Sequence, residues 1–405
     1  MEKQEFYGQA RRDLAGPLAG LTVVEATTTW AGPMAACVLA DLGARVIKVE
    51  HPQGEVARVL PPFVPDSQLT VPNETVNRNK ESLSLELHTE AGKAILLKLI
   101  EQTDVFIENF RPGTLASWGL GYADLRAVKA DIVYVSISGY GQFGPLSPRV
   151  GYDPVAQNFS GWTSMNGEPD GGPLKAPTYL GDDLGGLHGA LGALAALRHR
   201  DQTGEGQHVD VALTDSVLFQ SNGLATAGAL GVTPARLGNQ FAIAAPVNAY
   251  DCEDGKVYAG VLLDSHWQTL AAELGCEELA HLRGPERIEQ RTRVDGLLAD
   301  YCRQHSVQHV VDRFGDLGLP ATRINQAHEL HQVPHIQARD MLIDTPVADG
   351  KTLPLVGPVA KFSRTPTTIR QSAPTLGQHN EAILADLGFS ADEVQALRKG
   401  GVISG

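Results

Sequence analysis

The order of apolar and polar positions in the first 50 residues is typical of alternating strands and helices. Short apolar runs over Thr22–Ala26 and Arg45–Glu50 predict two strands. Between them, a polar turn leads into small and apolar residues that predict a helix at about Gly32–Leu42. This succession of strand, helix and strand is a βαβ unit.

The same alternation continues beyond residue 200. The predicted elements are a helix at Glu90–Glu101, a strand in DVFIENF (104–110), a short helix near Leu125, a strand in DIVYVSISGYG (131–141), a small-residue helix after Gly181 and a strand in HVDVAL (208–213). Helices that alternate with apolar strands predict an α/β fold with a Rossmann-like, doubly wound parallel sheet.

Ligands of doubly wound sheets bind beyond the carboxyl ends of the strands. Four loops that follow predicted strand ends are rich in small or polar residues: Thr27–Gly32, His51–Gly54, Asn109–Gly113 and Ser138–Gly144. We therefore expect the functional site to be built from these loops.

The pattern of predicted elements changes near Asn239. Short strands replace the alternation of strands and helices there, and amphipathic helices follow. The tail holds proline-rich strands and a last helix at Ser390–Lys399. The expected domains are a large domain over residues 1–224, a smaller α+β domain over 225–330, and a return segment, 331–405, that completes the large domain.

Composition narrows the class of protein. The 405 residues, 42% of them hydrophobic, are enough for two domains, and a net charge of −14 disfavours nucleic acid and anionic membranes as partners. No apolar stretch reaches the roughly 18 residues of a membrane span, and the first residues lack a signal or transit pattern. Four well-separated cysteines without a CxxC pair argue against zinc and disulfides. We expect a cytoplasmic protein.

Two patterns suggest a cofactor, and both are incomplete. Glu50 ends the second strand where a ribose-binding acid would lie, but the preceding turn, TTTWAGP, lacks the glycine fingerprint of dinucleotide-binding proteins. His328, His331 and His335 are spaced like metal ligands. A proline within this segment interrupts the helix that would align them, so we expect a surface loop and no metal.

A third pattern has the residue types of a hydrolase triad. Asp264, Ser265 and His266 are adjacent in the chain, however, and adjacent residues cannot form a triad. No GxSxG nucleophile elbow is present either. We expect a helix N-terminus at this place.

Asp182 comes directly before the run of glycine and alanine that predicts the long helix. Aspartate is a good N-cap, which is the ordinary interpretation of such a position. A carboxylate at a helix N-terminus is also held ionised by the dipole and local N–H groups, as a nucleophilic carboxylate must be. The two roles are compatible, and this argument does not separate Asp182 from Asp183.

Three basic residues lie nearest the predicted strand ends: Arg111 in ENFRPG, and Arg78 and Lys80 in NRNKES. Each alone is more often a solvated surface charge. Together they are the best candidates for a phosphate-facing pocket on this acidic protein.

Taken jointly, motifs from Leu18 to Leu384 resemble the family III coenzyme A transferases. The matching segments, in the family's order, are LAGLTVVE, AGPMAACVLADLGARVIKVE, NRNKESLSLEL, DVFIENFRPGTLASWGLGY, SISGYGQFGP, GYDPVAQNFSGWTSMNG, GDDLGG, TGEGQHVDVALTDSV and TLGQHNEAIL. The match is specific because it extends over most of the chain.

The resemblance implies a catalytic aspartate in a pattern of Asp, three residues and Gly, which is met here by Asp182 with Gly186. It also implies that these residues border coenzyme A: Trp30, Ala31, His51, Leu85, His88, Asn109, Phe110 and Arg111. His51 and His88 stand where formyl-CoA transferase has arginine and lysine. The segment GNQFAIAAPVNAY departs from the commoner form as well, so the acid specificity stays open.

The resemblance implies that the chain moves coenzyme A from an acyl-CoA, such as succinyl-CoA, to a carboxylic acid through aspartyl anhydride and aspartyl thioester intermediates, without a metal. The family also implies a homodimer of two chains interlocked like links. One alternative is an acyl-CoA racemase of the same family, whose Gly-His-Asp motif is replaced here by GYDP with Tyr152. A non-catalytic coenzyme-binding protein is the other.

Overall fold

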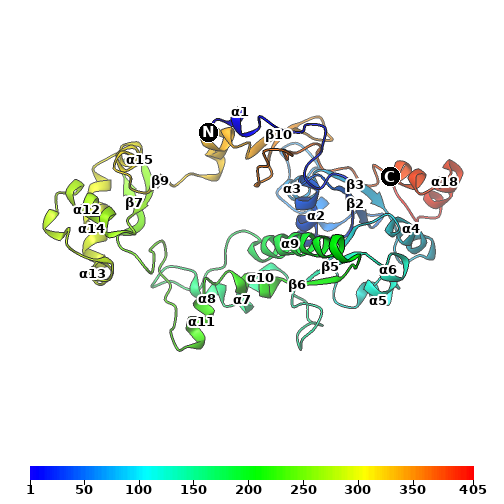
Figure 1. Ribbon diagram of the computed structural model, residues 1–405, viewed down its shortest axis with the longest axis horizontal. Helices are drawn as coiled ribbons and strands as arrows, with labels where there is room; N and C mark the ends of the chain where they lie inside the picture. The colour runs from blue at the N-terminus through cyan, green and yellow to red at the C-terminus, as the bar shows by residue number, and fades with distance from the viewer. The chain divides into compact units, whose positions relative to one another are not determined.

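The computed structural model describes residues 1–405, which form two compact units (Figure 1). The first unit consists of Met1–Trp162, Lys175–Thr226 and Pro334–Gly405. The second consists of Thr163–Leu174 and Ala227–Val333. The chain therefore leaves the first unit and returns to it.

A six-stranded sheet forms the centre of the first unit. Its strands are β1 (Thr22–Ala26), β2 (Arg45–Glu50), β3 (Lys80–Ser84), β4 (Val105–Glu108), β5 (Val133–Ser138) and β6 (His208–Ala212). All neighbours pair in parallel, in the order β3-β2-β1-β4-β5-β6. The predicted parallel sheet is confirmed, and its chain order reverses between β1 and β4.

Helices cover both faces of this sheet, as a doubly wound fold requires. Val23 of β1 faces a core formed with α2 (Ala31–Asp41) and α9 (Leu180–Thr203). Val24 faces the opposite core. The helices on that side are α4 (Glu90–Ile100), α6 (Tyr122–Val128), α17 (Asn380–Asp386) and α18 (Ala391–Lys399). Side chains alternate between the two cores because successive strand residues point to opposite faces.

The remaining elements are shorter. In the first unit they are α1 (Lys3–Phe6), η1 (Val56–Arg58), α3 (Val71–Val76), α5 (Thr114–Ser117), α7 (Asp153–Phe159), α10 (Leu213–Phe219), α16 (Pro334–Ala338) and the antiparallel pair β10 (Leu342–Pro346) and β11 (Thr352–Val356). Two helices extend across the unit boundaries: α8 (Trp162–Met165) and α11 (Leu224–Ala229).

Strand β3 is an element that the hydrophobic pattern did not reveal, because its buried residues are mostly polar. Ser82 N–H donates to His379 Nδ1 at 3.1 Å, and Ser84 N–H donates to Asn380 Oδ1 at 2.9 Å. The Ser84 hydroxyl donates to Ser404 O at 2.6 Å. The C-terminal segment thus provides hydrogen-bond partners for the polar groups of this edge strand. Without that segment, water would have to provide them.

The expectation that Arg78 and Lys80 face a phosphate is wrong. Arg78 is 6% exposed and its guanidinium pairs with Asp41 at 2.7 Å. Lys80 is fully buried, and its Nζ lies 2.6 Å from Glu25 Oε1. Both cations neutralise buried carboxylates within the fold, because an unpaired buried charge is very costly. Arg111, by contrast, lines a pocket and has no carboxylate partner.

Helix α9 packs closely against α2, and Gly186 is at their contact. A Cβ at this position would lie 2.8 Å from Ala31 O and 2.9 Å from Met34 Cβ. We expect Gly186→Ala to destabilise the protein by about 1–3 kcal/mol, measured by urea unfolding. Gly296→Ala is the matched control, because a Cβ there meets nothing within 4 Å and alanine favours helix. Equal effects of the two substitutions would contradict this assignment.

The second unit is a smaller α+β body. Its antiparallel sheet has the order β7-β8-β9, with β7 (Val247–Cys252), β8 (Gly255–Gly260) and β9 (Ala321–Arg323). Its helices are α12 (Asp264–Glu273), η2 (Glu277–Leu279), α13 (Gly284–Glu289), α14 (Arg291–Arg303), α15 (Val307–Asp316) and η3 (Ala327–Gln332). Trp267 and Phe314 are fully buried in its core. Asp264 begins α12, as predicted, and pairs with Arg287 at 2.7 Å.

None of the helices is both long enough and apolar enough to cross a membrane. The structure also contains no group of three or more His, Cys, Asp or Glu side chains arranged to hold a metal ion. His328 and His331 lie in η3, whereas His335 lies in α16.

Candidate active site

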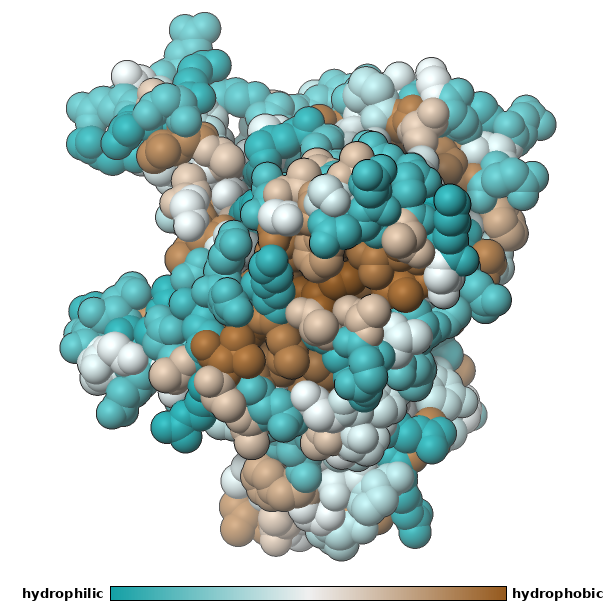
Figure 2. Space-filling model, turned by 90° about the vertical axis from the view of Figure 1, so that its right-hand side faces the viewer, coloured by the Kyte–Doolittle hydropathy of each residue, from teal (hydrophilic) through white to brown (hydrophobic).

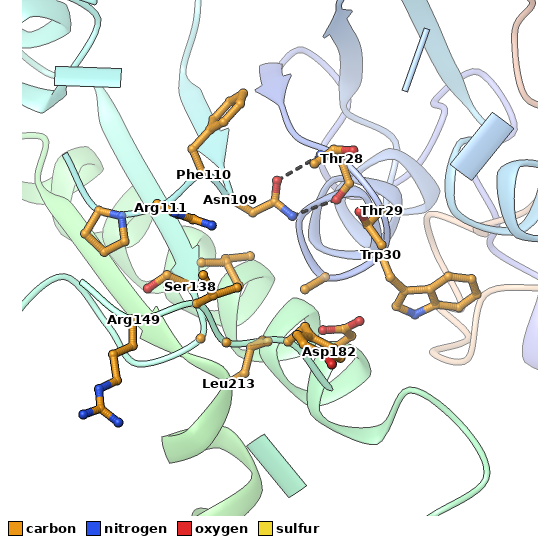
Figure 3. A pocket seen from close by; sticks show the side chains of 17 residues that line it. Thr28, Thr29, Trp30, Asn109, Phe110, Arg111, Ser138, Arg149, Asp182 and Leu213 are labelled. Atoms are coloured by element: carbon orange, nitrogen blue, oxygen red, sulfur yellow. Dashed lines mark hydrogen bonds between the residues drawn. The ribbon is translucent and has the colours of Figure 1, made fainter. Parts of the chain in front are cut away.

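A pocket of about 180 Å³ lies beyond the carboxyl ends of β1, β4 and β5, at the point where the strand order reverses (Figure 3). Its lining residues are Thr28, Thr29, Trp30, Ala31, Asn109, Phe110, Arg111, Pro112, Ile137, Ser138, Gly139, Arg149, Val150, Gly151, Tyr152, Asp182 and Leu213. Three of the four loops expected from the sequence therefore meet here, and they bring Trp30, Ala31 and the Asn109–Arg111 segment together with Asp182.

A second pocket, of about 270 Å³, contains the other three residues implied to border the coenzyme. It is lined by Ala26, Thr27, Thr28, Val49, Glu50, His51, Gly54, Glu55, Val56, Leu85, Glu86, Leu87, His88, Phe110 and Trp118. Thr28 and Phe110 line both pockets. All the site residues that the sequence predicted thus line two adjoining pockets. These pockets lie along the carboxyl edge of the sheet, and the second one extends to the end of β3.

The loop from Thr27 to Trp30 is held from two sides. The Asn109 side chain accepts a hydrogen bond from Thr28 N–H at 2.9 Å and donates one to Thr28 O at 2.8 Å (Figure 3). Glu55 accepts from Thr29 N–H at 3.0 Å. Thr29 has a φ of 70°, a strained conformation for a β-branched residue. These bonds fix the loop in that conformation and so define one wall of the pocket.

Asp182 lies in the first turn of α9, three residues into the helix, and it lines the first pocket. The residue at the N-cap is Tyr179, which makes no capping hydrogen bond through its side chain. The interpretation of Asp182 as an N-cap is therefore wrong. Its carboxyl group is free of a capping role and faces the pocket with Trp30 and the Asn109–Arg111 segment (Figure 3).

Three aspartates are grouped around the start of α9. Burial, together with the smaller effect of the nearby carboxylates of Asp153 and Asp183, raises the pKa of Asp182 to about 7. The expectation that the helix N-terminus holds Asp182 ionised is thus wrong for the protein without substrate. Desolvation and two like charges outweigh the helix dipole, whose effect is smaller.

The two neighbouring aspartates, Asp182 and Asp183, differ in what they contact. The Asp183 carboxylate accepts a hydrogen bond from Trp30 Nε1 at 2.6 Å, which fixes that carboxylate and orients the indole. Asp182 has no such partner and lines the pocket, whereas Asp183 does not. The geometry therefore separates two residues that the sequence argument left equivalent.

Asp153 is a site residue that the sequence analysis did not single out. It is 2% exposed, and its carboxylate accepts from Gly181 N–H at 2.7 Å and from Gln157 Nε2 at 2.9 Å. It thereby anchors the start of α9 and places a negative charge beside Asp182. Its only signal in the sequence is its place in the motif GYDPVAQ, directly after Tyr152, which replaces the racemase histidine.

Two arginines border the first pocket without a carboxylate partner. Arg111 extends toward the pocket, and Arg149 extends away from it in the close view (Figure 3). Tyr152 lines the pocket too and is 61% exposed. The position of the racemase histidine is thus part of the same pocket, but in this chain it carries a phenol.

Fold and site together define a class: a doubly wound α/β protein with a half-buried carboxyl group of raised pKa at the switch point of its sheet. The family model described as CoA-transferase family III matches residues 18–380. The chain belongs to this family, and it is a CoA-transferase.

Proteins similar to this chain carry names consistent with that membership. The beta subunit of succinyl-CoA–L-malate CoA-transferase from Chloroflexus aurantiacus is 36% identical, over 96% of this chain and 98% of its own length. Succinate–glutarate CoA-transferase from Agrobacterium fabrum is 34% identical, over 92% and 96%. Acetyl-CoA:oxalate CoA-transferase from Acetobacter aceti is also 34% identical, over 94% and 97%.

Solved structures agree with the fold. A CAIB/BAIF family protein from Brucella suis superposes with a TM-score of 0.81 at 33% identity, covering 92% of this chain and 100% of that one. Rv3272 from Mycobacterium tuberculosis gives 0.80 at 29% identity, covering 91% and 99%. The arrangement of the six-stranded sheet is therefore shared with known members of the family.

Proposed function

We propose that this CoA-transferase works through covalent catalysis by Asp182. The observation that carries the proposal is the position of this half-buried carboxyl group in the switch-point pocket, which Trp30, Ala31 and Asn109–Arg111 also line. The first pocket then holds the reacting thioester, and the second, with His51, Leu85 and His88, holds the nucleotide part of coenzyme A.

The proposed reaction has two half-reactions. The Asp182 carboxylate attacks the thioester carbonyl of the donor, which forms a mixed anhydride and releases the coenzyme thiolate. The thiolate then attacks the aspartyl carbonyl, giving an aspartyl thioester and the free donor acid. The acceptor carboxylate attacks this thioester, and the same steps in reverse form the new acyl-CoA and restore Asp182. The thioester bond energy is conserved, so neither ATP nor a metal takes part.

The pocket offers hydrogen-bond donors for the oxyanion that forms at each step. Helix α2 begins at Ala31, and the first N–H groups of a helix have no partner within the helix. The N-terminus of α2 therefore supports a developing negative charge near Asp182. Trp30 and Phe110 exclude water on either side of the loop, which protects the anhydride from hydrolysis.

For substrates, we propose succinyl-CoA as the donor and a short dicarboxylic acid as the acceptor. Two of the relatives named above are named for succinyl-CoA with L-malate and for succinate with glutarate, and the third for acetyl-CoA with oxalate. Two others are named for succinyl-CoA with D-citramalate and with mesaconate. Arg111, which has no carboxylate partner of its own, is positioned to attract an anionic substrate to the pocket.

We also propose that the protein is an interlocked homodimer in the cytosol. Helices α9 and α10 pack together and expose large apolar side chains that a monomer would leave in water: Leu187, Leu191, Leu218 and Phe219. Figure 2 shows hydrophobic side chains gathered in a hollow on one face of the molecule, between hydrophilic ridges. A second copy of the chain is the partner that the family resemblance supports for such surfaces.

The test of the covalent route is mass spectrometry after incubation with a panel of acyl-CoAs and hydroxylamine. We expect a hydroxamate on the peptide that contains Asp182, absent from the Asp182→Asn variant, and strongest with succinyl-CoA. An adduct on another residue, or none with any donor, would overturn the proposal. In the second case, binding without turnover would indicate a coenzyme-binding protein, and exchange of an α-proton would indicate a racemase.

The pH dependence of loading should follow the ionisation of Asp182. Its pKa is about 7, and only the ionised carboxylate is nucleophilic. At a limiting concentration of succinyl-CoA, the rate of thioester formation should therefore rise about tenfold from pH 6 to pH 8. Rapid-quench measurement of the labelled protein gives this rate. A flat profile over this range would show that the carboxylate is already ionised before the substrate binds.

A further inference from the structure

A buried ion pair contacts the loop that leads into α2. Lys48 on β2 is fully buried, and the side chain of Glu55, in the segment after that strand, is 5% exposed. Lys48 Nζ and Glu55 Oε1 lie 3.3 Å apart. Removing two charges from water is costly, and a buried ion pair often stabilises a fold no better than apolar side chains of similar size. A role beyond stability is therefore indicated by what the pair contacts.

Each member of the pair binds one end of the loop. Lys48 Nζ donates a hydrogen bond to Thr27 O at 3.2 Å. Glu55 Oε2 accepts from Thr29 N–H at 3.0 Å and from the Thr28 hydroxyl at 3.2 Å. The two oxygens of the Glu55 carboxylate thus have separate roles, because Oε1 pairs with Lys48 whereas Oε2 binds the loop.

Thr29 is the residue of the loop that depends on this support. Its φ of 70° lies in the left-handed region, which a β-branched residue rarely adopts. Such a conformation persists only where the surrounding structure holds it. Asn109 binds both backbone groups of the preceding Thr28, but the N–H group of Thr29 itself is bound by Glu55. Without this carboxylate, we expect Thr29 to relax to a negative φ.

The conformation of Thr29 sets the direction in which α2 begins. Trp30 is the N-cap of this helix. The N–H groups of Ala31 and Gly32 have no partner within the helix, and Pro33 has no N–H. These two groups are therefore the donors that α2 can offer to an oxyanion in the first pocket, which Ala31 lines.

Asp182 lies on the face of α9 that packs against the start of α2. Gly186 is four residues further along the helix and so lies on the same face. A Cβ at Gly186 would lie 2.8 Å from Ala31 O. Asp182 and Ala31 also line the same pocket. A change in the first turn of α2 would therefore move its donors relative to the carbonyl group that Asp182 attacks.

We propose that the buried Lys48–Glu55 ion pair positions the catalytic site. It holds Thr29 in the left-handed conformation and so keeps the first N–H groups of α2 directed at the oxyanion that forms beside Asp182. Neither side chain of the pair lines the first pocket, so both are positioning residues. The inference rests on the proposed function, because it assumes that the oxyanion forms in this pocket.

The test replaces the pair by apolar side chains of similar size, in the variant Lys48→Met/Glu55→Met. Glu25 keeps its pair with Lys80, so no unpaired charge is buried, and we expect the free energy of unfolding in urea to stay close to that of the wild type. The rate at which saturating succinyl-CoA loads Asp182, measured by rapid quench, should fall about ten- to hundredfold. The KM should change by less than about threefold, because oxyanion donors act in the transition state.

Adding Thr29→Gly to this variant separates positioning from stability. Glycine adopts a positive φ without strain, so it can take the left-handed conformation without help from the ion pair. We expect the loading rate to recover by at least about threefold. A purely structural role of the pair predicts no recovery, because glycine only adds conformational entropy to the unfolded chain.

Asp104→Asn is the matched control. The Asp104 carboxylate accepts from Thr22 N–H at 2.8 Å and pairs with Arg200 at 2.8 Å. It therefore links a backbone N–H to a cation, as Glu55 does, but it precedes β4 and so lies at the opposite edge of the sheet from the pockets. This variant should lower the free energy of unfolding and leave the loading rate within about twofold of the wild type.

Three results would overturn the inference: loading by Lys48→Met/Glu55→Met at nearly the wild-type rate, an equal loss in Asp104→Asn, or no recovery with Thr29→Gly. If the double variant does not fold, Glu55→Gln takes its place. A single amide oxygen cannot accept from Thr29 and pair with Lys48 at once, so loading should fall at least about threefold. Absence of an adduct in the wild-type protein would instead refute the proposed function.

Discussion

Asp182→Asn is expected to reduce coenzyme A transfer at least about a thousandfold, because asparagine has the same shape but its amide is not a nucleophile. Asp182 lines the pocket and is not the N-cap of α9. The substitution therefore removes the proposed nucleophile with little change in packing. Initial rates with succinyl-CoA and a panel of dicarboxylic acids, followed by chromatography of the acyl-CoA products, measure the loss. Activity within tenfold of the wild type would exclude Asp182 as the nucleophile.

Asp183→Asn is the matched control for this prediction. Asparagine can still accept the hydrogen bond from Trp30 Nε1, so the indole should stay in place. The variant also removes one of the charges that raise the pKa of Asp182, so its pH profile should shift to lower pH. We expect a loss of activity of about tenfold or less at pH 8. If Asp183→Asn lost more transfer activity than Asp182→Asn, Asp183 and not Asp182 would be the nucleophile.

The same Asp182→Asn variant should be more stable than the wild type at high pH. Because the folded-state pKa of Asp182, about 7, lies above its ordinary value, the stability that this group contributes is present at low pH and lost as pH rises through 7. Asparagine carries no charge and avoids this loss. Its melting temperature should therefore exceed that of the wild type by a few degrees at pH 8, and by less at pH 4. This readout also shows that the inactive variant is folded.

Much of the first unit could be predicted from the chain alone, because its strands and helices differ sharply in hydrophobic period. Strands Thr22–Ala26 and Arg45–Glu50 have the predicted bounds. Helix α2 differs from the prediction by one residue at each end, and α4 by one residue at its C-terminal end. These elements bury apolar side chains on defined faces, which is the property that periodicity measures. The carboxyl-edge location of the pockets followed from the same sheet topology.

Strand β3 could not be predicted in this way, because most of its buried residues are polar and give no hydrophobic period. Its stability depends on partners about 300 residues away in the chain, such as the bond between Ser84 and Asn380. A short segment of sequence does not identify such a distant partner. A serine or lysine considered without its partner is therefore expected to be exposed to solvent. The error over Arg78 and Lys80 has this origin too, since the carboxylates that bind them lie on other elements.

The site was predicted mainly through the family resemblance rather than from periodicity. Composition and spacing alone could not separate Asp182 from Asp183, because the distinction depends on which one Trp30 contacts. They also could not give the direction of the pKa shift of Asp182, which depends first on its burial in the fold and then on Asp153, a residue almost 30 positions earlier. The contact of Glu86 with both His51 and His88 is likewise a tertiary feature of two strand ends.

Lys80→Met is expected to destabilise the protein by about 3–5 kcal/mol, because it leaves a buried carboxylate without its nearest cation. Lys80 Nζ donates to Glu25 Oε1 at 2.6 Å, to Pro33 O at 2.9 Å and to Asn77 Oδ1 at 3.0 Å, all within the buried interior. Methionine fills the space but leaves the carboxylate of Glu25 with the Thr27 hydroxyl as a donor and with only one cation, the more distant Lys48, 3.8 Å away. The midpoint of urea unfolding, at an unchanged slope, measures the cost.

A double variant and a surface variant test whether charge is the cause. Lys80→Met with Glu25→Gln should recover most of the lost stability, because no unpaired charge is then buried. Lys93→Met, which breaks a pair with the exposed Glu90, should change stability by no more than about 0.5 kcal/mol. If Lys80→Met and Lys93→Met reduce the free energy of unfolding equally, the buried pair does not support the fold.

Because Pro33 is in the first turn of α2, loss of Lys80 should also disturb the pocket wall at Ala31 and slow the loading of Asp182.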